Sequence, residues 1–279
     1  MVSQFLRSAV LKVLPKSTLG DKIYSFLCFL GCHKRLPNSS DDFIDTLYRT
    51  KVDGTLQSSL RCFISDKYYM KVFVDGVLGF GYTVPTLALL NCKEDIDKFV
   101  AEQECVVKPS HSSGFVKFCS VGDKLDDDNY HKWLYDNYYE YSREFNYKNL
   151  PGRLIVEPLL FDDKNIKDYK FFFLDGRFLF VQVDVDRSFN HTRSFYDRNF
   201  SFLGFSTKYP LSPVQCSPSN FDEMLEVAEK LAKHFCGLIR IDLYSNGTEL
   251  KVGEITNCHG SGFEHIVPEG RKVLLSDYL

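Results

Sequence analysis

The spacing of the apolar residues changes about one third of the way along the chain. Up to about residue 90 they mostly recur with a helical period, most clearly over residues 41–48 and 65–74, until Pro85 interrupts the pattern. Further helices are predicted over residues 94–102 and 130–145. We therefore expect a mostly helical N-terminal region that precedes a mixed α+β region.

Short runs rich in β-branched and aromatic residues predict strands in the rest of the chain. Residues 105–108 form such a run, and residues 116–121 can pair with it as a hairpin across the loop 110–114. Three further strands are expected over residues 153–160, 169–174 and 177–184. The last two strands are joined at Asp175-Gly176, a dipeptide typical of tight hairpin turns.

The C-terminal part predicts a helix followed by two paired strands. Residues 219–235 carry one apolar helical stripe, in which Ser219 and Asp222 resemble a capping box. Gly237 marks the C-terminal end of this helix. Strands are expected over residues 238–244 and 250–255, joined through Asn246-Gly247.

Charged residues on these two strands form a candidate metal site. Arg240 and Asp242 alternate with apolar residues and therefore share one face of their strand. Glu254 lies on the next strand, and two carboxylates with a hydroxyl or amide nearby offer the hard oxygen ligands that Mg²⁺ prefers. The alternative is a salt-bridge network on a solvated sheet face.

The turn between these strands decides whether the two carboxylates can meet. A simple two-residue turn would pair Glu254 with Ile239 and point it away from Asp242. One shared metal therefore requires an odd-length loop or a bulge that brings Glu254 beside Asp242. We predict such a departure from the simple two-residue turn.

Lys108 is the second candidate. It ends a predicted strand, and the small-residue loop 110–114 follows it, so its ammonium and the loop N–H groups could grip phosphates. The chain lacks the glycines of a P-loop before this lysine, and a surface hairpin loop beside an exposed lysine is the alternative.

A third group of charged residues lies between residues 168 and 193. Lys170, Arg187 and Arg193 could hold an anionic substrate and a phosphoryl group in transit. Asp184-Val185-Asp186 also resembles the metal-binding Asp-x-Asp of sugar-nucleotide glycosyltransferases, a tripeptide that is common by chance.

Composition narrows the classes of function. A net charge of -3 gives no basic bias that would indicate nucleic acid as a partner. The nine cysteines are scattered, which indicates reduced thiols of a cytoplasmic protein. The apolar run 23–32 is too short to span a bilayer, whereas residues 1–18 form a basic amphipathic start. This start either docks on the protein's own core or makes peripheral contact with the inner face of a membrane.

Ten segments from about residue 36 onwards carry a family resemblance. They are residues 65–68, 81–85, 106–114, 154–160, 168–172, 182–187, 191–197, 240–244, 253–256 and 260–263. In this order they resemble the ATP-grasp proteins similar to the teichuronopeptide biosynthesis protein, found in bacterial capsule and cell-surface polysaccharide loci. The resemblance implies an ATP-grasp fold in which two α+β subdomains, residues 91–160 and 161–279, sandwich ATP after a helical region, residues 1–90.

The resemblance also implies roles for individual residues. The implied ATP-binding residues are Lys67, Lys108, Ser110, His111, Ser112, Ser113, Gly114, Glu157, Pro158 and Leu159. The implied catalytic cations are Lys170, Arg187, Arg193 and Arg240, and the implied Mg²⁺ ligands are Asp242 and Glu254 with either Thr256 or Asn257. Many ATP-grasp enzymes carry Asn where this chain has Thr256, so the third ligand stays open.

The function implied is an ADP-forming carboxylate–amine ligase that uses ATP and Mg²⁺ and acts through an acyl phosphate. By the same resemblance, the acid is a uronic acid of a capsule or surface polysaccharide precursor, and the amine is an amino acid or small amine. Two alternatives remain. One is a metal-dependent glycosyltransferase of capsule biosynthesis, and the other is a non-catalytic nucleotide-binding or membrane-scaffold module that rests on the basic N-terminal helix.

Overall fold

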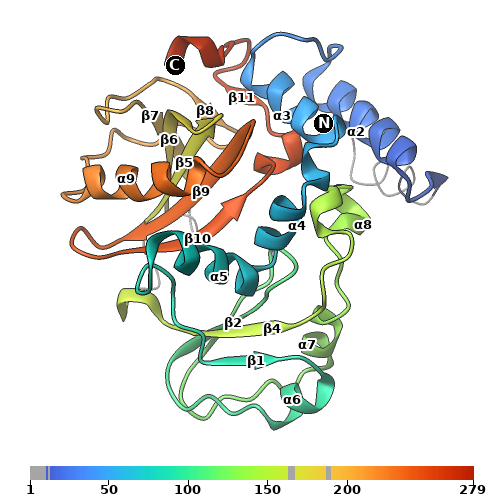
Figure 1. Cartoon of the computed structure of the whole chain (residues 1–279), viewed down its shortest axis with the longest axis vertical. Coiled ribbons are helices and arrows are strands. Elements are labelled where there is room, and N and C mark those ends of the chain that lie inside the picture. Colours follow the sequence, from blue (N-terminus) through green and yellow to red (C-terminus); the bar gives the residue numbers. More distant parts are fainter. Residues whose placement is uncertain (1–10, 12, 163–166, 187–189) are drawn as a thin grey trace.

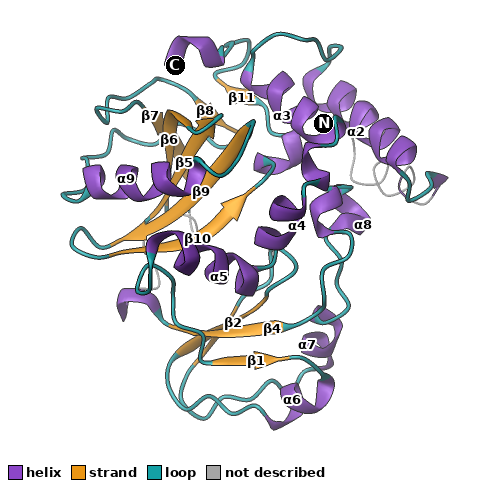
Figure 2. Ribbon diagram, in the orientation of Figure 1, coloured by secondary structure: helices purple, strands orange, loops and turns teal. Residues whose placement is uncertain are grey.

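The computed structural model of the chain describes residues 11, 13–162, 167–186 and 190–279. Its strands form a five-stranded sheet, a four-stranded sheet and a two-stranded ladder (Figures 1 and 2). Within these ranges, none of the helices is both long and apolar enough to cross a bilayer. Most of the predicted amphipathic start, residues 1–10 and 12, lies outside the described residues.

The larger sheet is antiparallel, with the order β10-β9-β5-β6-β7. Its strands are β5 (Asp168–Leu174), β6 (Arg177–Val185), β7 (Thr192–Tyr196), β9 (Leu238–Ser245) and β10 (Leu250–Thr256). Helix α9 (Phe221–Ala232) covers one face (Figure 1). Met224, Ala228 and Leu231 recur at helical spacing on α9 and are fully buried against the sheet.

The other face of the larger sheet is apolar at one end and polar at the other. At the apolar end, the Phe43 ring meets Phe172 and Phe180 edge to face, with ring centroids 5.4 and 5.3 Å apart. Helices α2 (Thr18–His33) and α3 (Phe43–Val52) share this core. Helices α4 (Ser59–Ser65) and α5 (Lys67–Leu78) share the core of α9 instead, and they lie between the two sheets (Figure 1).

The smaller sheet has the order β1-β4-β2-β3. Its strands are β1 (Ala88–Leu90), β2 (Cys105–Pro109), β3 (Lys117–Cys119) and β4 (Leu154–Pro158), with α6 (Lys93–Lys98) and α7 (Asp128–Trp133) beside them (Figure 2). Val107 and Val156 belong to its core. Because side chains alternate along a strand, Lys108 and Glu157 point to the opposite face, towards α5.

The remaining elements are short. They are η1 (Thr55–Gln57), α8 (Tyr139–Ser142), η2 (Phe145–Tyr147), η3 (Leu160–Asp162), β8 (Ser206–Thr207), η4 (His259–Gly262), β11 (Ile266–Val267) and η5 (Leu275–Tyr278). β8 and β11 pair as the two-stranded ladder.

Several sequence predictions are confirmed and two are wrong. The hairpin across the loop 110–114 forms, with Cys105 opposite Cys119. The continuous helix at residues 130–145 is wrong, because Asn137 accepts a bond from the Tyr139 N–H (3.1 Å) in a local turn that competes with a helix. The capping box is also wrong, since Asn220 is the N-cap and Ser219 donates instead to the Gly247 carbonyl (2.5 Å).

Candidate active site

Two lysines share one carboxylate between the smaller sheet and α5. Glu157 on β4 accepts an ion pair from Lys71 of α5 at Oε1 and one from Lys108 of β2 at Oε2, both 2.6 Å. Burial alone would raise the pKa of Glu157, but the two ammonium groups outweigh it and lower the pKa. Pro158 and Leu159 follow at the end of β4 and are half-buried.

The base of the loop after Lys108 is fixed. Ser110, His111 and Ser112 are buried, and the Ser110 hydroxyl donates to Asp66, the N-cap of α5 (2.8 Å). The Ser112 hydroxyl donates to Asp136. Ser113 and Gly114 are exposed, and Gly114 has a φ of 97°, a conformation that glycine adopts at no steric cost. The exposed part of this hairpin connection is its tip, residues 113–116.

Lys67 connects this cluster with the larger sheet. Its ammonium donates to the Ser112 carbonyl (2.6 Å). Burial lowers the pKa of Lys67, while the charges of Glu254 and Glu157 raise it and the charge of Lys108 lowers it further. The Glu254 charge on the larger sheet therefore acts on a lysine that is hydrogen-bonded to the loop after Lys108.

A network of ion pairs covers the polar end of the larger sheet. Arg240 donates from Nε and Nη2 to the two oxygens of Asp242, both at 2.7 Å. Lys170, opposite Asp242 on β5, has its Nζ 3.9 Å from Asp242 and 3.4 Å from Asp184, and it also pairs with Asp168. Burial raises the pKa of Asp242, and the Arg240 charge offsets this only in part.

The strand register brings the two candidate metal carboxylates together. The loop after β9 is longer than a two-residue turn, since Ser245 pairs with Leu250. The register then shifts between Val252 and Glu254, and Glu254 lies directly opposite Asp242. The predicted departure from a simple turn is therefore confirmed.

Gly253 is the residue at which this bulge forms. A Cβ at Gly253 would lie 2.4 Å from the Tyr244 ring on β9, closer than any real contact allows. Glycine thus allows the Tyr244 ring to cover the backbone at the bulge.

Thr256 ends β10 and Asn257 follows it, and the two side chains point in different directions. The Thr256 hydroxyl accepts a bond from Arg240 Nη2 (2.9 Å), on the face of the metal candidates. Asn257 is buried against α4, where its Oδ1 accepts from Arg61 (3.0 Å) and its Nδ2 donates to Ser65 (3.0 Å). Asn257 is thus engaged in helix packing. Arg187, a predicted substrate cation, lies outside the described residues.

The network continues from Arg193 to two residues that the sequence did not single out, Glu264 and His259. Arg193 pairs with Asp184 (2.6 Å) and with Glu264 (2.7 Å). His259 lies 3.0 Å from Glu264 through Nε2 and 2.6 Å from the Arg240 guanidinium through Nδ1. Burial lowers the pKa of His259 to about 4, so the ring is neutral at pH 7. Since Arg240 can only donate, the proton resides on Nε2 and is donated to Glu264.

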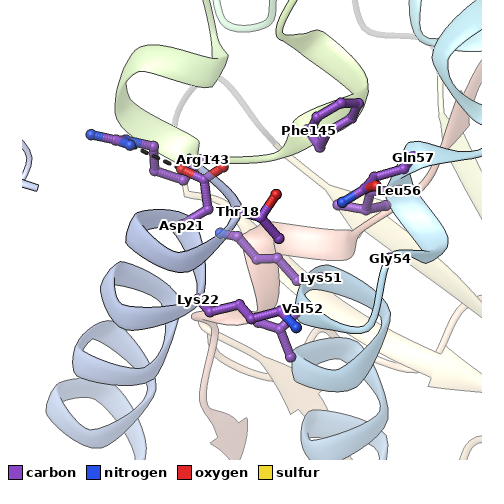
Figure 3. A pocket seen from close by; sticks show the side chains of 10 residues that line it. All are labelled: Thr18, Asp21, Lys22, Lys51, Val52, Gly54, Leu56, Gln57, Arg143 and Phe145. Atoms are coloured by element: carbon purple, nitrogen blue, oxygen red, sulfur yellow. Dashed lines mark hydrogen bonds and ion pairs between the residues drawn. The ribbon is translucent and has the colours of Figure 1, made fainter. Parts of the chain in front are cut away.

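A separate small pocket lies between α2, α3 and η2 (Figure 3). Residues that line it include Asp21, Lys51 and Arg143, and none of the predicted site residues is among them. Arg143 is buried and pairs with Asp21 (2.9 Å), and it also donates to the carbonyls of Leu11, Leu14 and Pro15. Arg143 therefore binds the segment that precedes α2.

Comparison with known families gives the identity of the fold. The model of the TupA-like ATP-grasp family matches residues 47–279, which is most of the chain. The chain belongs to the TupA-like ATP-grasp family. The predicted ATP-grasp fold, with α+β content and a helical N-terminal region, is therefore confirmed.

Solved structures similar to this ATP-grasp chain include three enzymes. D-alanine–D-alanine ligase from Helicobacter pylori is 20% identical over 72% of this chain and 53% of its own, with a TM-score of 0.40. D-alanine–D-alanine ligase from Bacillus anthracis is 19% identical over 77% of this chain and 67% of its own, with a TM-score of 0.41. N5-carboxyaminoimidazole ribonucleotide synthetase, in a complex with ADP, is 11% identical over 72% of this chain and 47% of its own, with a TM-score of 0.46. The chain thus spans about half the length of two of these enzymes. No curated protein matches the chain.

ATP-grasp enzymes use ATP and Mg²⁺, and the side chains present suit both. The described residues hold no group of three or more His, Cys, Asp or Glu side chains around one metal position. Mg²⁺ in nucleotide sites is usually held by one or two carboxylates together with phosphate oxygens and water. Asp242 and Glu254, opposite each other on β9 and β10, form such a two-carboxylate set.

The sequence reasoning missed Lys71, His259 and Glu264. Lys71 lies one helical turn after Lys67 on α5, so the spacing of the two lysines could have revealed it. His259 and Glu264 follow β10 in an irregular segment, and no sequence period predicts that they meet.

Proposed function

We propose that this ATP-grasp chain is an ADP-forming carboxylate–amine ligase. The observation that carries the proposal is the position of Lys67, within electrostatic reach of Lys108 and Glu157 on the smaller sheet and of Glu254 on the larger one. Cations of α5 and the smaller sheet and the paired carboxylates of the larger sheet would then border one region, as binding of a magnesium nucleotide requires.

The lysine cluster is assigned to the nucleotide phosphates. Glu157 pairs with both Lys71 and Lys108, which leaves one positive charge in excess, and a triphosphate would offer both ammonium groups an additional anionic partner. The Lys67 ammonium and the N–H groups of residues 111–114 would add donors on the same side, whereas the Ser110 N–H is bonded to the Arg153 carbonyl (3.0 Å). Pro158 and Leu159, half-buried at the end of β4, are assigned to the adenine.

The larger sheet is assigned to the reacting end of the nucleotide. Asp242 and Glu254 would hold Mg²⁺, which when bound neutralises developing charge on the phosphates. Arg240 and Lys170 place two cations beside these carboxylates, where they can stabilise charge on the transferring phosphoryl group. Thr256 shares this face and is the candidate third oxygen donor, whereas Asn257 is assigned to packing on α4.

Arg193 is assigned a positioning role. Two acidic partners, Asp184 and Glu264, already neutralise its guanidinium, so it keeps little free charge for a substrate carboxylate. The glycosyltransferase alternative has less support, because the two carboxylates of Asp184-Val185-Asp186 differ in exposure. Asp184 is buried in β6, whereas Asp186 follows this strand and is exposed.

The substrate part of the proposal rests on the resemblance to proteins of capsule and surface-polysaccharide loci. We assign the acid to a uronic acid of a polysaccharide precursor and the amine to an amino acid or small amine. The chemistry suits this pairing, because a carboxylate is a poor electrophile until phosphorylation gives it a leaving group. The exposed tip of the loop 110–114 is the element available to exclude water from that intermediate.

The test is a screen for ADP release with uronic-acid nucleotides, amines and Mg²⁺, followed by product mass. We expect one acid and amine pair to release ADP and to give a product lighter by water than the sum of the two. Lys108→Gln should abolish turnover, whereas the matched variant Lys124→Gln, at an exposed lysine, should retain it. Equal turnover of the two variants would refute the assignment of Lys108.

A further inference from the structure

Helix α2 is apolar on the side that faces away from the protein. Tyr24, Cys28 and Phe29 form its buried face. Leu19, Ile23 and Leu27 recur at helical spacing on the other side and are 69%, 39% and 43% exposed. Phe26 and Leu30, between them on the helical wheel, are half-buried. An apolar stripe on a helix normally faces a partner, and within the described residues nothing covers Leu19, Ile23 and Leu27.

The charges around this apolar stripe are basic. Lys22 borders it and Lys34 follows it at the C-cap, and both are exposed and form no ion pair within the described part of the chain. Asp21, the one acidic residue in the sequence from 11 to 36, points inward and pairs with Arg143 at 2.9 Å. The whole chain carries a net charge of -3, so α2 departs from the overall charge.

We propose that the outer face of α2 docks on an anionic lipid bilayer surface. The apolar stripe of Leu19, Ile23 and Leu27 would enter the boundary of the acyl chains, and the ammonium groups of Lys22 and Lys34 would pair with lipid phosphates. Figure 1 shows α2 at the margin of the molecule.

A second copy of the chain fits this face less well. In a two-fold dimer with antiparallel α2 helices centred on Ile23, the middle of the stripe, Lys22 of one copy would lie beside Lys22 of the other, and parallel helices would also bring like lysines together. Either arrangement places positive charges against each other across an apolar contact. An anionic bilayer instead supplies both the apolar interior and the opposite charge.

The inference is independent of the proposed catalysis, since α2 contributes none of the assigned site residues. It is tested by co-sedimentation of the full chain with phosphatidylcholine vesicles, with and without phosphatidylserine. We expect binding only when phosphatidylserine is present, and weaker binding as salt rises. No binding to phosphatidylserine vesicles at low salt would overturn the proposal.

Variants separate α2 from the rest of the surface. Ile23→Gln with Leu27→Gln should weaken vesicle binding at least about tenfold. Lys22→Gln and Lys34→Gln should each weaken it about fivefold. Phe80→Gln, at a side chain that is 92% exposed elsewhere, is the matched control and should bind as the unmodified chain does.

Three results would contradict the assignment to α2. One is unchanged binding of the Ile23→Gln, Leu27→Gln variant that unfolds at the same temperature as the unmodified chain. Another is loss of binding only on deletion of residues 1–10. The third is light scattering that shows a dimer in the unmodified chain and a monomer in the variant, since a second copy would then cover this face.

Discussion

The bulge at Gly253 should be the most sensitive point of the candidate metal site. Gly253→Ala places a methyl group 2.4 Å from the Tyr244 ring, so the ring or the strand must move. Overpacking of this kind costs about 1–3 kcal/mol of the free energy of unfolding. Because the bulge sets Glu254 opposite Asp242, the displaced strand should also raise the Mg²⁺ concentration needed for ADP release. Urea unfolding and a magnesium titration of ADP release measure the two effects.

A double-mutant cycle with Tyr244→Ala isolates the cause. Without the ring, the added methyl group has room, and alanine is favoured over glycine within a strand by roughly 0.5–1 kcal/mol. Gly253→Ala should therefore be neutral or stabilising in the Tyr244→Ala background, with a coupling free energy of about 1–3 kcal/mol between the two sites. Equal destabilisation in both backgrounds would refute the reasoning, because the backbone rather than the ring would then exclude a side chain.

Three further predictions concern the charged groups. Asp242→Asn should lose about 3–5 kcal/mol of stability, because it breaks a buried ion pair. Glu254→Gln, at a half-buried residue, should cost less than about 1 kcal/mol of stability. Both variants should lose ADP release, and urea unfolding and turnover assays measure the two effects. Burial lowers the pKa of His259 from 6.5 to about 4, so the unfolded state binds the extra proton between these values, and the contribution of His259 to stability should fall by about 3 kcal/mol as pH falls through that window. In urea titrations, His259→Gln should therefore lose less stability than the unmodified chain between pH 6.5 and about 4. Lys71→Gln should weaken ATP binding as Lys108→Gln does, and calorimetric titration that shows unchanged affinity in either variant would contradict a shared phosphate site.

The sequence predicted those parts of the fold that follow a period or a geometric requirement. The register of β9 and β10 is an example, because a shared metal could be reconciled with the alternation of side chains only by a longer loop or a bulge. The strand that carries Lys108 and its hairpin partner followed from the β-rich pattern around a small-residue loop. The candidate carboxylates and Lys108 were therefore within reach of sequence reasoning.

The contacts between distant segments were not predictable in this way. Apolar spacing predicted a helix through residues 130–145, but the side-chain oxygen of Asn137 offers the backbone a competing local bond. The pairing of Glu157 with Lys71 depends on how α5 lies against β4, which no local pattern specifies. Asn257 was a candidate ligand because it lies close to Glu254 along the chain. Its hydrogen bonds to Arg61 and Ser65 show that it packs on α4 instead.

The central claim is that one nucleotide is held from both sheets at once. It is tested most directly by the anomalous scattering of Mn²⁺, in place of Mg²⁺, in crystals grown with ADP. We predict a manganese peak between the carboxylates of Asp242 and Glu254, with the diphosphate extending from it to the ammonium group of Lys108. Manganese bound elsewhere, or a diphosphate that reaches only one of the two sheets, would contradict the account.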